Sequence, residues 1–135
     1  MRIVLDTNVI VSALLKQGSV PDQVLELAIA RRCGLVVDSR IVADYRQVLS
    51  RPQFPFAPHR LSAFLALVDR SEWIVADPLA LSLPDDDDRP FVEVAVAGAA
   101  DAVVTGNAKD FHVKEGRLAI PIVTPRQFLD MLARR

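Results

Sequence analysis

The chain has 135 residues, of which 51% are hydrophobic and 24% are charged, and its formal net charge is −1. This size and composition predict a single globular domain spanning residues 1–135, and they exclude a disordered chain. The single cysteine, Cys33, excludes an internal disulfide and a zinc site of several thiolates, and it fits a reducing cytoplasm. No segment is long and apolar enough to predict a signal peptide or a membrane span.

The charge pattern neither favours nor excludes a nucleic-acid partner. All 16 basic residues except Lys16, Lys109 and Lys114 are arginine, the side chain best suited to bidentate phosphate contacts. The acidic residues are unevenly distributed, because the run 85–88 consists of aspartate alone. A cation bound there would make the local surface more positive than the formal count indicates.

Short apolar strands alternate with amphipathic helices along the chain. In chain order, the predicted elements are strand 2–5, helix 20–32, strand 34–37, helix 39–49, helix 61–68, strand 73–75, helix 90–98, strand 102–104, strand 120–123 and helix 125–132. This order predicts a three-layer α/β/α fold with a central parallel sheet of four to five strands. Ligands of such sheets bind at the carboxyl ends of the strands, where the strand order reverses.

The first polar group at such an end is Asp6, with Thr7 and Asn8 after it. A strand-ending aspartate is often only a turn former or a helix cap. Here the polar residues lie between two apolar runs, and buried polar groups need partners, so a metal or a hydrogen-bond network is expected.

A second acid, Asp44, lies in the predicted helix 39–49, on the edge of the apolar stripe that includes Ile41 and Val48. That position predicts a carboxylate on the edge of the inward face rather than on the solvent face. The alternative is a local ion pair with Arg40, four residues earlier.

Two further polar groups follow the later elements. Asp88 precedes the predicted helix 90–98, and it is expected to cap this helix, to direct an oxygen into the crevice, or both. Thr105 and Asn107 follow the fourth strand, and Asp110 comes three residues later. Several carboxylates in one crevice repel one another unless a cation lies among them, and oxygen ligands favour Mg²⁺ or Mn²⁺. Such ions activate water for in-line attack on a phosphodiester.

Three segments resemble the PIN-domain family: Ile3–Val9 resembles its opening strand motif, Asp88–Ala95 its third-acid helix and Asp101–Asn107 its fourth-strand motif. The segment Ser39–Phe54 is similar to a branch of toxin components of toxin–antitoxin systems, the VapC-like ribonucleases. The similarity covers nearly the whole chain, and the ordered set of motifs is more specific than any single motif.

The resemblance implies a ribonuclease with acids at Asp6, Asp44 and Asp88, a fourth polar position at Asn107, and Asn8 and Thr105 as orienting residues. It also implies an antitoxin protein as partner. The chain departs from the family at two positions. Asp44 replaces the usual glutamate, and Asn107 replaces a frequent aspartate, for which Asp110 is the expected substitute. These departures make a weakly active member an alternative.

The sequence fits two other enzyme and signalling families less well. A phosphatase of the haloacid-dehalogenase type needs a second aspartate at the position of Asn8. A receiver domain needs an acidic pair after the first strand, where this sequence has only Asp6. A PIN-like module that binds RNA or protein without cutting is the alternative from another class. His59 and His112 are expected in surface loops. Phe54, Phe56 and Phe64 exceed what one small core is expected to hide, which predicts a homodimer or higher oligomer.

Overall fold

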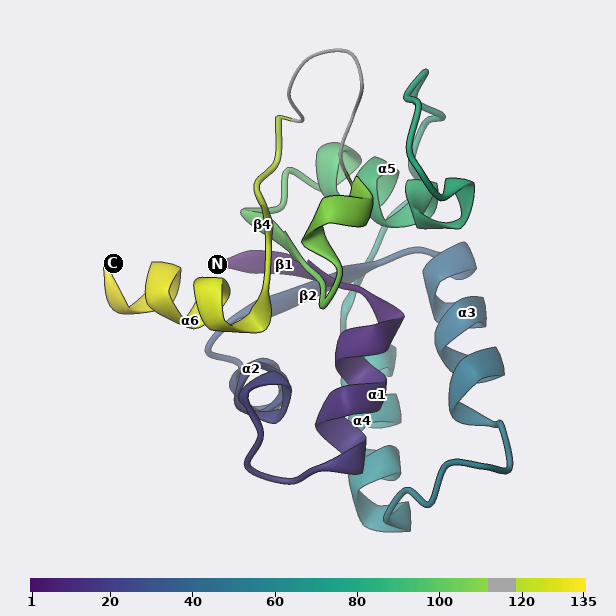
Figure 1. The fold of residues 1–135 in the computed structure, drawn as a ribbon, viewed down its shortest axis with the longest axis vertical. Coiled ribbons are helices and arrows are strands. Elements are labelled where there is room, and N and C mark those ends of the chain that lie inside the picture. Colours follow the sequence, from purple (N-terminus) through teal and green to yellow (C-terminus); the bar gives the residue numbers. More distant parts are fainter. Residues whose placement is uncertain (112–118) are drawn as a thin grey trace.

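The computed structural model describes residues 1–111 and 119–135 of the chain (Figure 1). His112 therefore lies outside the described residues. In chain order, the elements are β1 (Arg2–Leu5), α1 (Thr7–Leu15), α2 (Val20–Ile29), β2 (Gly34–Val37), α3 (Ser39–Leu49), α4 (Pro58–Asp69), β3 (Glu72–Trp73), the 3-10 helix η1 (Asp86–Asp88), α5 (Arg89–Ala97), β4 (Ala102–Val104), the 3-10 helix η2 (Ala108–Phe111), β5 (Ile122–Val123) and α6 (Pro125–Ala133).

The five strands form one parallel sheet in the order β3-β2-β1-β4-β5. In Figure 1, α5 lies on one face of this sheet, and α1, α2, α4 and α6 lie on the other. Helix α3 stands at the end of the sheet where β1 and β2 finish, and it contacts both α1 and α5. The predicted three-layer α/β/α architecture with five parallel strands is therefore confirmed.

The central strands are apolar because helices cover both of their faces. The side chains of β1 from Ile3 to Leu5 and all three of β4 are fully buried. In the register between these strands, Leu5 lies opposite Val104, so the residues that follow each strand emerge side by side. The most buried part of the sheet thus fixes the position of the polar residues after it.

Helix α1 was not predicted from the sequence. Its residues Val9, Ile10 and Val11 form a continuous β-branched run, which resembles a buried strand rather than an amphipathic helix. In the structure, Val9 and Ile10 are buried, and α1 packs against α2 and α3. A helix that is apolar on most sides shows no clear period, and tertiary packing decides its conformation.

Several predicted boundaries shift. The predicted helix 20–32 ends at Ile29, and the predicted strand 73–75 becomes Glu72–Trp73, followed by Val75 at 96% exposure. The fifth strand is reduced to Ile122–Val123. Asp38 caps α3, because its Oδ1 accepts the N–H of Ile41 at 2.9 Å.

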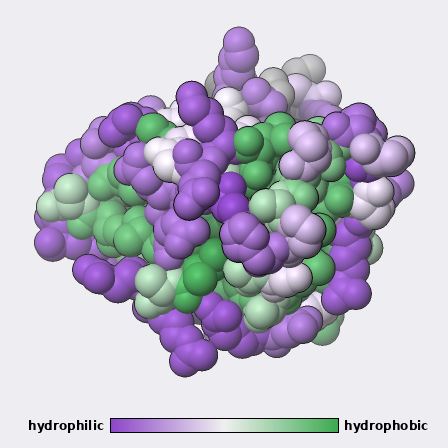
Figure 2. Space-filling view, turned by 90° about the horizontal axis from the view of Figure 1, so that it is seen from below, coloured by the Kyte–Doolittle hydropathy of each residue, from purple (hydrophilic) through white to green (hydrophobic). Residues whose placement is uncertain are grey.

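Only two of the three phenylalanines that were predicted to remain outside the core do so. Phe64 is fully buried, so its expected exposure is wrong. Phe54 and Phe56 are partly exposed and stack on each other with 5.1 Å between ring centroids. Figure 2 shows apolar residues in several patches separated by polar ones on the face seen from below. No helix in the described part of the chain is long and apolar enough to cross a membrane.

Candidate active site

The candidate site lies at the carboxyl ends of β1 and β4, where the strand order changes direction. Parallel α/β sheets leave a ligand-binding crevice at such a point. Asp6 directly follows β1, and Thr105 directly follows β4. The backbone N–H of Asp6 donates to the carbonyl of Val104 at 2.9 Å, which extends the pairing of the two strands to the site.

Asp6 is 7% exposed, and Thr105 is fully buried. The Thr105 hydroxyl donates to Asp6 Oδ2 at 2.7 Å. Burial raises the pKa of Asp6, whereas the Thr105 hydroxyl and the N–H groups of Thr7 and Asn8 lower it. The neighbouring charge of Asp44 raises it again, and the net direction is upward. The site thus contains a carboxylate whose ionised form is incompletely compensated, a condition that a bound cation would relieve.

Asp44 reaches this site from α3. The Thr7 hydroxyl at the start of α1 donates a hydrogen bond to Asp44 Oδ2, and the carboxylate is close enough to Asp6 to raise its pKa. Asp44 is partly exposed, so one side of it remains accessible to solvent. The structure therefore brings Asp6 and Asp44 together, each with a threonine hydroxyl as donor.

The alternative partner for Asp44 is elsewhere. The Arg40 guanidinium contacts Asp38 Oδ2 at 2.8 Å and Glu93 Oε1 at 2.7 Å. Glu93 is 2% exposed and also accepts the N–H of Leu79 at 2.7 Å. The predicted alternative of an ion pair between Arg40 and Asp44 is thus wrong, because two buried acids already bind this arginine.

Tyr45 of α3 has a role at the site that was not predicted from the sequence. Its hydroxyl donates to the carbonyl of Leu5, the last residue of β1. Burial, followed by the nearby charges of Asp6 and Asp44, raises the pKa of Tyr45 well above its ordinary value. The hydroxyl therefore remains a neutral donor and ties α3 to the strand that carries Asp6. The only sequence signal was a polar atom on an inward stripe.

The first turn of α1 and the loop after β4 are hydrogen-bonded to each other. Asn8 Oδ1 accepts the N–H of Gly106 at 3.1 Å, and the N–H of Asn107 donates to Thr105 Oγ1 at 3.1 Å. These contacts hold the side chains of Asn8 and Thr105 in place, and the orienting role expected for both residues stays a prediction. Asn107 itself is exposed. Asp110 lies in η2, and its side chain is outside the described part, so the choice between Asn107 and Asp110 stays a prediction.

Asp88 occupies the N-cap position of α5 and is partly exposed, but the predicted side-chain cap is absent. Its side chain makes no capping hydrogen bond to this described helix. Earlier in the acidic run, Asp85 Oδ1 accepts the N–H of Asp87 at 3.0 Å, and Asp86 contacts the Arg89 guanidinium at 2.8 Å. The backbone thus folds the run into a compact corner, and the reach of Asp88 into the crevice remains a prediction.

A cleft of about 330 Å³ lies between α3 and this acidic corner. It is lined by Arg40, Ile41, Asp44, Gln47, Asp86, Asp87, Pro90 and Phe91. Asp86 and Asp87, from the aspartate run 85–88, are exposed and share the cleft with Asp44. Their clustering was visible in the sequence, whereas the side of the loop that faces α3 is set by tertiary packing.

The described residues of the candidate site provide two carboxylate ligands for a divalent ion rather than three. Within residues 1–111 and 119–135, no three His, Cys, Asp or Glu side chains are grouped closely enough to hold a metal ion. The structure therefore does not gather Asp6, Asp44 and Asp88 into one set. Magnesium often binds through one or two carboxylates, and water and substrate phosphate complete its octahedron. The oxygen donors of Asp6 and Asp44 match this mode.

Comparisons with known proteins agree with this architecture. The crystal structure of VapBC2 from Rickettsia felis bound to a DNA fragment from their promoter is similar, with a TM-score of 0.58 and 20% sequence identity over 92% of this chain and 98% of that chain. At this identity, the similarity establishes the fold alone. Among curated proteins, none matches. A family model described as PIN domain matches residues 2–109, a range that includes both strands of the candidate site, and the chain therefore belongs to the PIN-domain family.

Proposed function

We propose that this chain is a ribonuclease that uses Mg²⁺ or Mn²⁺ to hydrolyse phosphodiester bonds in single-stranded RNA. Membership of the PIN family supports a nuclease, and hence a hydrolase, in general. The observation that carries the finer proposal is the pair Asp6 and Asp44, held by the hydroxyls of Thr105 and Thr7 at the switch point of the sheet. Two oriented carboxylates at this position favour metal-assisted hydrolysis over covalent catalysis.

In this proposal, Asp6 and Asp44 hold the ion, and their threonine donors keep the carboxylate oxygens in place. When bound, the ion lowers the pKa of a water molecule and neutralises charge on the phosphodiester. Asp88 and either Asn107 or Asp110 complete the polar lining, and Asn8 keeps the loop after β4 in register. Thr105 fixes two elements at once, because it donates to Asp6 and accepts from the N–H of Asn107.

The cleft beside Asp44 supports the need for a cation. Its acids Asp44, Asp86 and Asp87 outnumber its single basic residue, Arg40, whose guanidinium already binds two other acids. A polyanion such as RNA is repelled by such a surface unless a cation neutralises it. Cleavage is therefore expected to need free divalent ion even at low ionic strength, where RNA binding by basic proteins is strongest.

The second candidate is a PIN-fold module that binds RNA or protein without cleavage. Two observations favour it: the acids of the described residues form no group of three, and Asp44 is one methylene shorter than the glutamate of the family. Titration with Mn²⁺ separates the candidates. Saturable binding that disappears in Asp6→Asn supports the nuclease, and the absence of binding by the parent supports the module.

The central test is cleavage of single-stranded RNA by the purified chain. We expect cleavage with Mg²⁺ or Mn²⁺ and none with EDTA, because the carboxylates alone cannot activate water. Asp6→Asn is expected to abolish cleavage while the fold is retained, and Asp88→Asn, which changes the polar lining rather than an ion ligand, is expected to reduce cleavage. Asp130→Asn is the matched control, because this aspartate is exposed on α6. The Asp130→Asn variant is expected to cleave RNA like the parent.

Two results would overturn the mechanism. One is cleavage that persists in EDTA, and the other is an Asp6→Asn variant that cuts RNA as fast as the parent. Circular dichroism of every variant accompanies the assay, so that a loss of activity with an unchanged spectrum is assigned to the site.

We also propose that a small antitoxin protein binds and silences the chain. The similar crystal structure from Rickettsia felis is named as VapBC2 bound to its promoter DNA, which supports a partnered PIN protein. Expression in a bacterial host without a partner is expected to arrest growth and degrade RNA. Normal growth with intact RNA would contradict the toxin assignment.

We also propose a homodimer or higher oligomer, although fewer aromatic side chains are exposed than the sequence predicted. Phe64 is buried, but Trp73 is 46% exposed, and Val75 is almost fully exposed. Light scattering at tens of micromolar, roughly the range in which a modest interface assembles, tests it. A monodisperse monomer there would contradict the proposal.

A further inference from the structure

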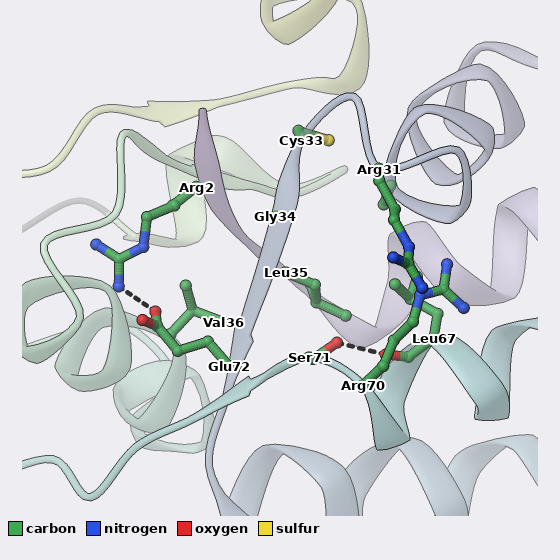
Figure 3. Close-up of a pocket in the computed structure, with 11 residues that line it drawn as sticks. Arg2, Arg31, Cys33, Gly34, Leu35, Val36, Leu67, Arg70, Ser71 and Glu72 are labelled. Atoms are coloured by element: carbon green, nitrogen blue, oxygen red, sulfur yellow. Dashed lines mark hydrogen bonds and ion pairs between the residues drawn. The ribbon is translucent and has the colours of Figure 1, made fainter.

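A second cavity lies at the opposite end of the sheet from Asp6. It has a volume of about 430 Å³ and is lined at the amino ends of three strands by Arg2, Gly34 and Glu72 (Figure 3). Its apolar lining comes from Ala28, Leu35, Val36 and Leu67. This volume is in the range of small-molecule sites, which combine apolar walls with a few polar groups.

The charges around this cavity are strongly unbalanced. Three arginines, Arg2, Arg31 and Arg70, line it, and among the described residues the only acid in its lining is Glu72, which pairs with Arg2. Figure 3 shows Arg31 and Arg70 together on one edge, with the pair of Arg2 and Glu72 on the other. The edge with Arg31 and Arg70 therefore carries two positive charges without an acid in the lining.

These two arginines are bound to different extents. Arg70 donates from Nη2 to the carbonyl of Ile29 at 2.7 Å, which keeps its side chain over the cavity. Arg31 makes no side-chain hydrogen bond or ion pair with any residue that the structure describes. Adjacent guanidinium groups repel each other, and an anion between them removes this repulsion.

The backbone of Arg31 is also unusual. It follows the last turn of α2 with φ of 62°, in the left-handed region that favours glycine. The N–H of Arg31 donates to the carbonyl of Ala28, and that of Arg32 to Leu27, which is the hydrogen-bond pattern of a Schellman cap. An arginine at this position carries a conformational cost that glycine would avoid. In return, the arginine side chain places a guanidinium group at the edge of the cavity.

We infer that this cavity binds a nucleoside monophosphate, with its phosphate between Arg31 and Arg70 and its base or sugar against Leu35 and Leu67. A phosphate monoester carries a charge of about −1.5 to −2 at neutral pH, which matches two guanidinium groups better than a carboxylate does. Arginine forks bind phosphate in a bidentate manner and stack on aromatic rings. The charge of Glu72 disfavours a phosphate at the other edge.

A nucleoside with a phosphate monoester occurs in two kinds of ligand, a free mononucleotide and the 5′-phosphate end of an RNA strand. The inference does not rest on the proposed cleavage, because the cavity is at the amino ends of the strands and Asp6 is at the carboxyl end of β1. An Asp6→Asn chain is therefore expected to bind nucleotide like the parent, so failure of one proposal is distinguishable from failure of the other.

Calorimetric titration of the full chain with adenosine 5′-monophosphate and with inorganic phosphate tests the site. We expect nucleotide to bind more tightly than inorganic phosphate, with an affinity that falls as salt rises. Arg31→Gly and Arg70→Gln are each expected to weaken nucleotide binding about tenfold or more, since each removes a charge-assisted contact. Ala99→Gly is the matched control, because Ala99 occupies the equivalent left-handed position after α5, with φ of 49°, and is not part of the cavity lining.

A second arm identifies the source in the Asp6→Asn background, where RNA is expected to remain uncut. Tighter binding of a 5′-phosphorylated oligoribonucleotide than of its 5′-hydroxyl counterpart assigns the site to RNA ends, and equal binding assigns it to free nucleotide. The inference is overturned if the parent binds no nucleotide, if inorganic phosphate binds as tightly as the nucleotide, or if folded Arg31→Gly binds nucleotide as tightly as the parent and Ala99→Gly do.

Discussion

The two ends of the parallel sheet carry opposite charges. At the carboxyl ends, Asp6 and Asp44 lie together, and Asp86 and Asp87 face the adjoining cleft. At the amino ends, Arg2, Arg31 and Arg70 line the second cavity. The net charge of −1 therefore does not show that positive and negative side chains gather at opposite ends of the sheet. It also does not indicate where an anion or a cation binds.

The two ends also differ in how their charged groups are held. Asp6 is buried and fixed by a threonine hydroxyl from another strand, so its position is set by the sheet itself. Arg31 and Arg70 are exposed, and their positions depend on the ends of helices α2 and α4. Preorganisation of this kind suits chemistry at the carboxyl end, whereas adjustable guanidinium groups suit reversible binding at the amino end.

Thr105→Val is expected to have the largest effect among the changes that leave every acid in place. It removes the donor to Asp6 and the acceptor for the N–H of Asn107, while the shape of the side chain is kept. Loss of such supporting contacts typically lowers metal affinity or activity by about 10- to 100-fold. RNA cleavage as a function of Mn²⁺ concentration measures it, and Thr105→Ser, which keeps the hydroxyl, is expected to restore activity.

Changes at Asp44 test whether the shorter acid limits the carboxyl end. Asp44→Ala is expected to reduce cleavage about tenfold or more, because it leaves Asp6 as the single proposed carboxylate ligand of the pair. Asp44→Glu is expected to preserve or increase the rate. His59→Ala is the control, because His59 is exposed in the first turn of α4 and lines a different cavity. If Asp44→Ala cuts like the parent, α3 contributes no catalytic group.

Asp6→Asn is expected to stabilise the metal-free fold near neutral pH. Burial raises the pKa of Asp6 above its ordinary value of 3.8, so the folded state favours the protonated form. The resulting penalty is absent well below that value and grows as the pH rises through the folded pKa. Urea unfolding in EDTA should show Asp6→Asn above the parent near pH 7 and a smaller difference near pH 3. A variant less stable than the parent at both values contradicts this account.

Arg31→Gly is expected to have the smallest effect on stability, a gain of ~0.5–1 kcal/mol. Glycine removes the left-handed strain at φ of 62° but adds freedom to the unfolded chain. Ala99→Gly should give a similar gain, and thermal unfolding measures both. Equal gains, with nucleotide binding reduced only by Arg31→Gly, would separate the backbone role of this position from its side-chain role.

The sequence predicted the carboxyl-end residues better than the amino-end ones for a physical reason. Asp6 and Thr105 directly follow buried apolar strands, and parallel strands finish at one edge, so their proximity follows from the fold class. Arg31 and Arg70 lie at the ends of helices, where the boundary of each helix decides the side-chain position. The predicted helix 20–32 placed Arg31 inside the helix, which concealed its left-handed conformation.

Other errors came from contacts between distant elements. The apolar run of Val9, Ile10 and Val11 has no distinguishing period, so the sequence alone did not separate a buried helix from a strand. Spacing placed Arg40 beside Asp44, but Asp38 and the buried Glu93 bind this arginine. Glu93 is 53 residues away along the chain, and such pairing is set by tertiary structure.

The hydrogen bond between Thr105 and Asp6 joins residues that are 99 positions apart, and this separation has a consequence for synthesis. At about 5–20 residues per second, the ribosome makes Asp6 on the order of 5 to 20 s before Thr105. Strand β1 has only β2 to pair with during that interval, and Asp6 lacks both its hydroxyl donor and the neighbouring strand. Its polar surroundings are therefore assembled only after β4 and Thr105 have been made, so a shorter nascent chain lacks the complete candidate site.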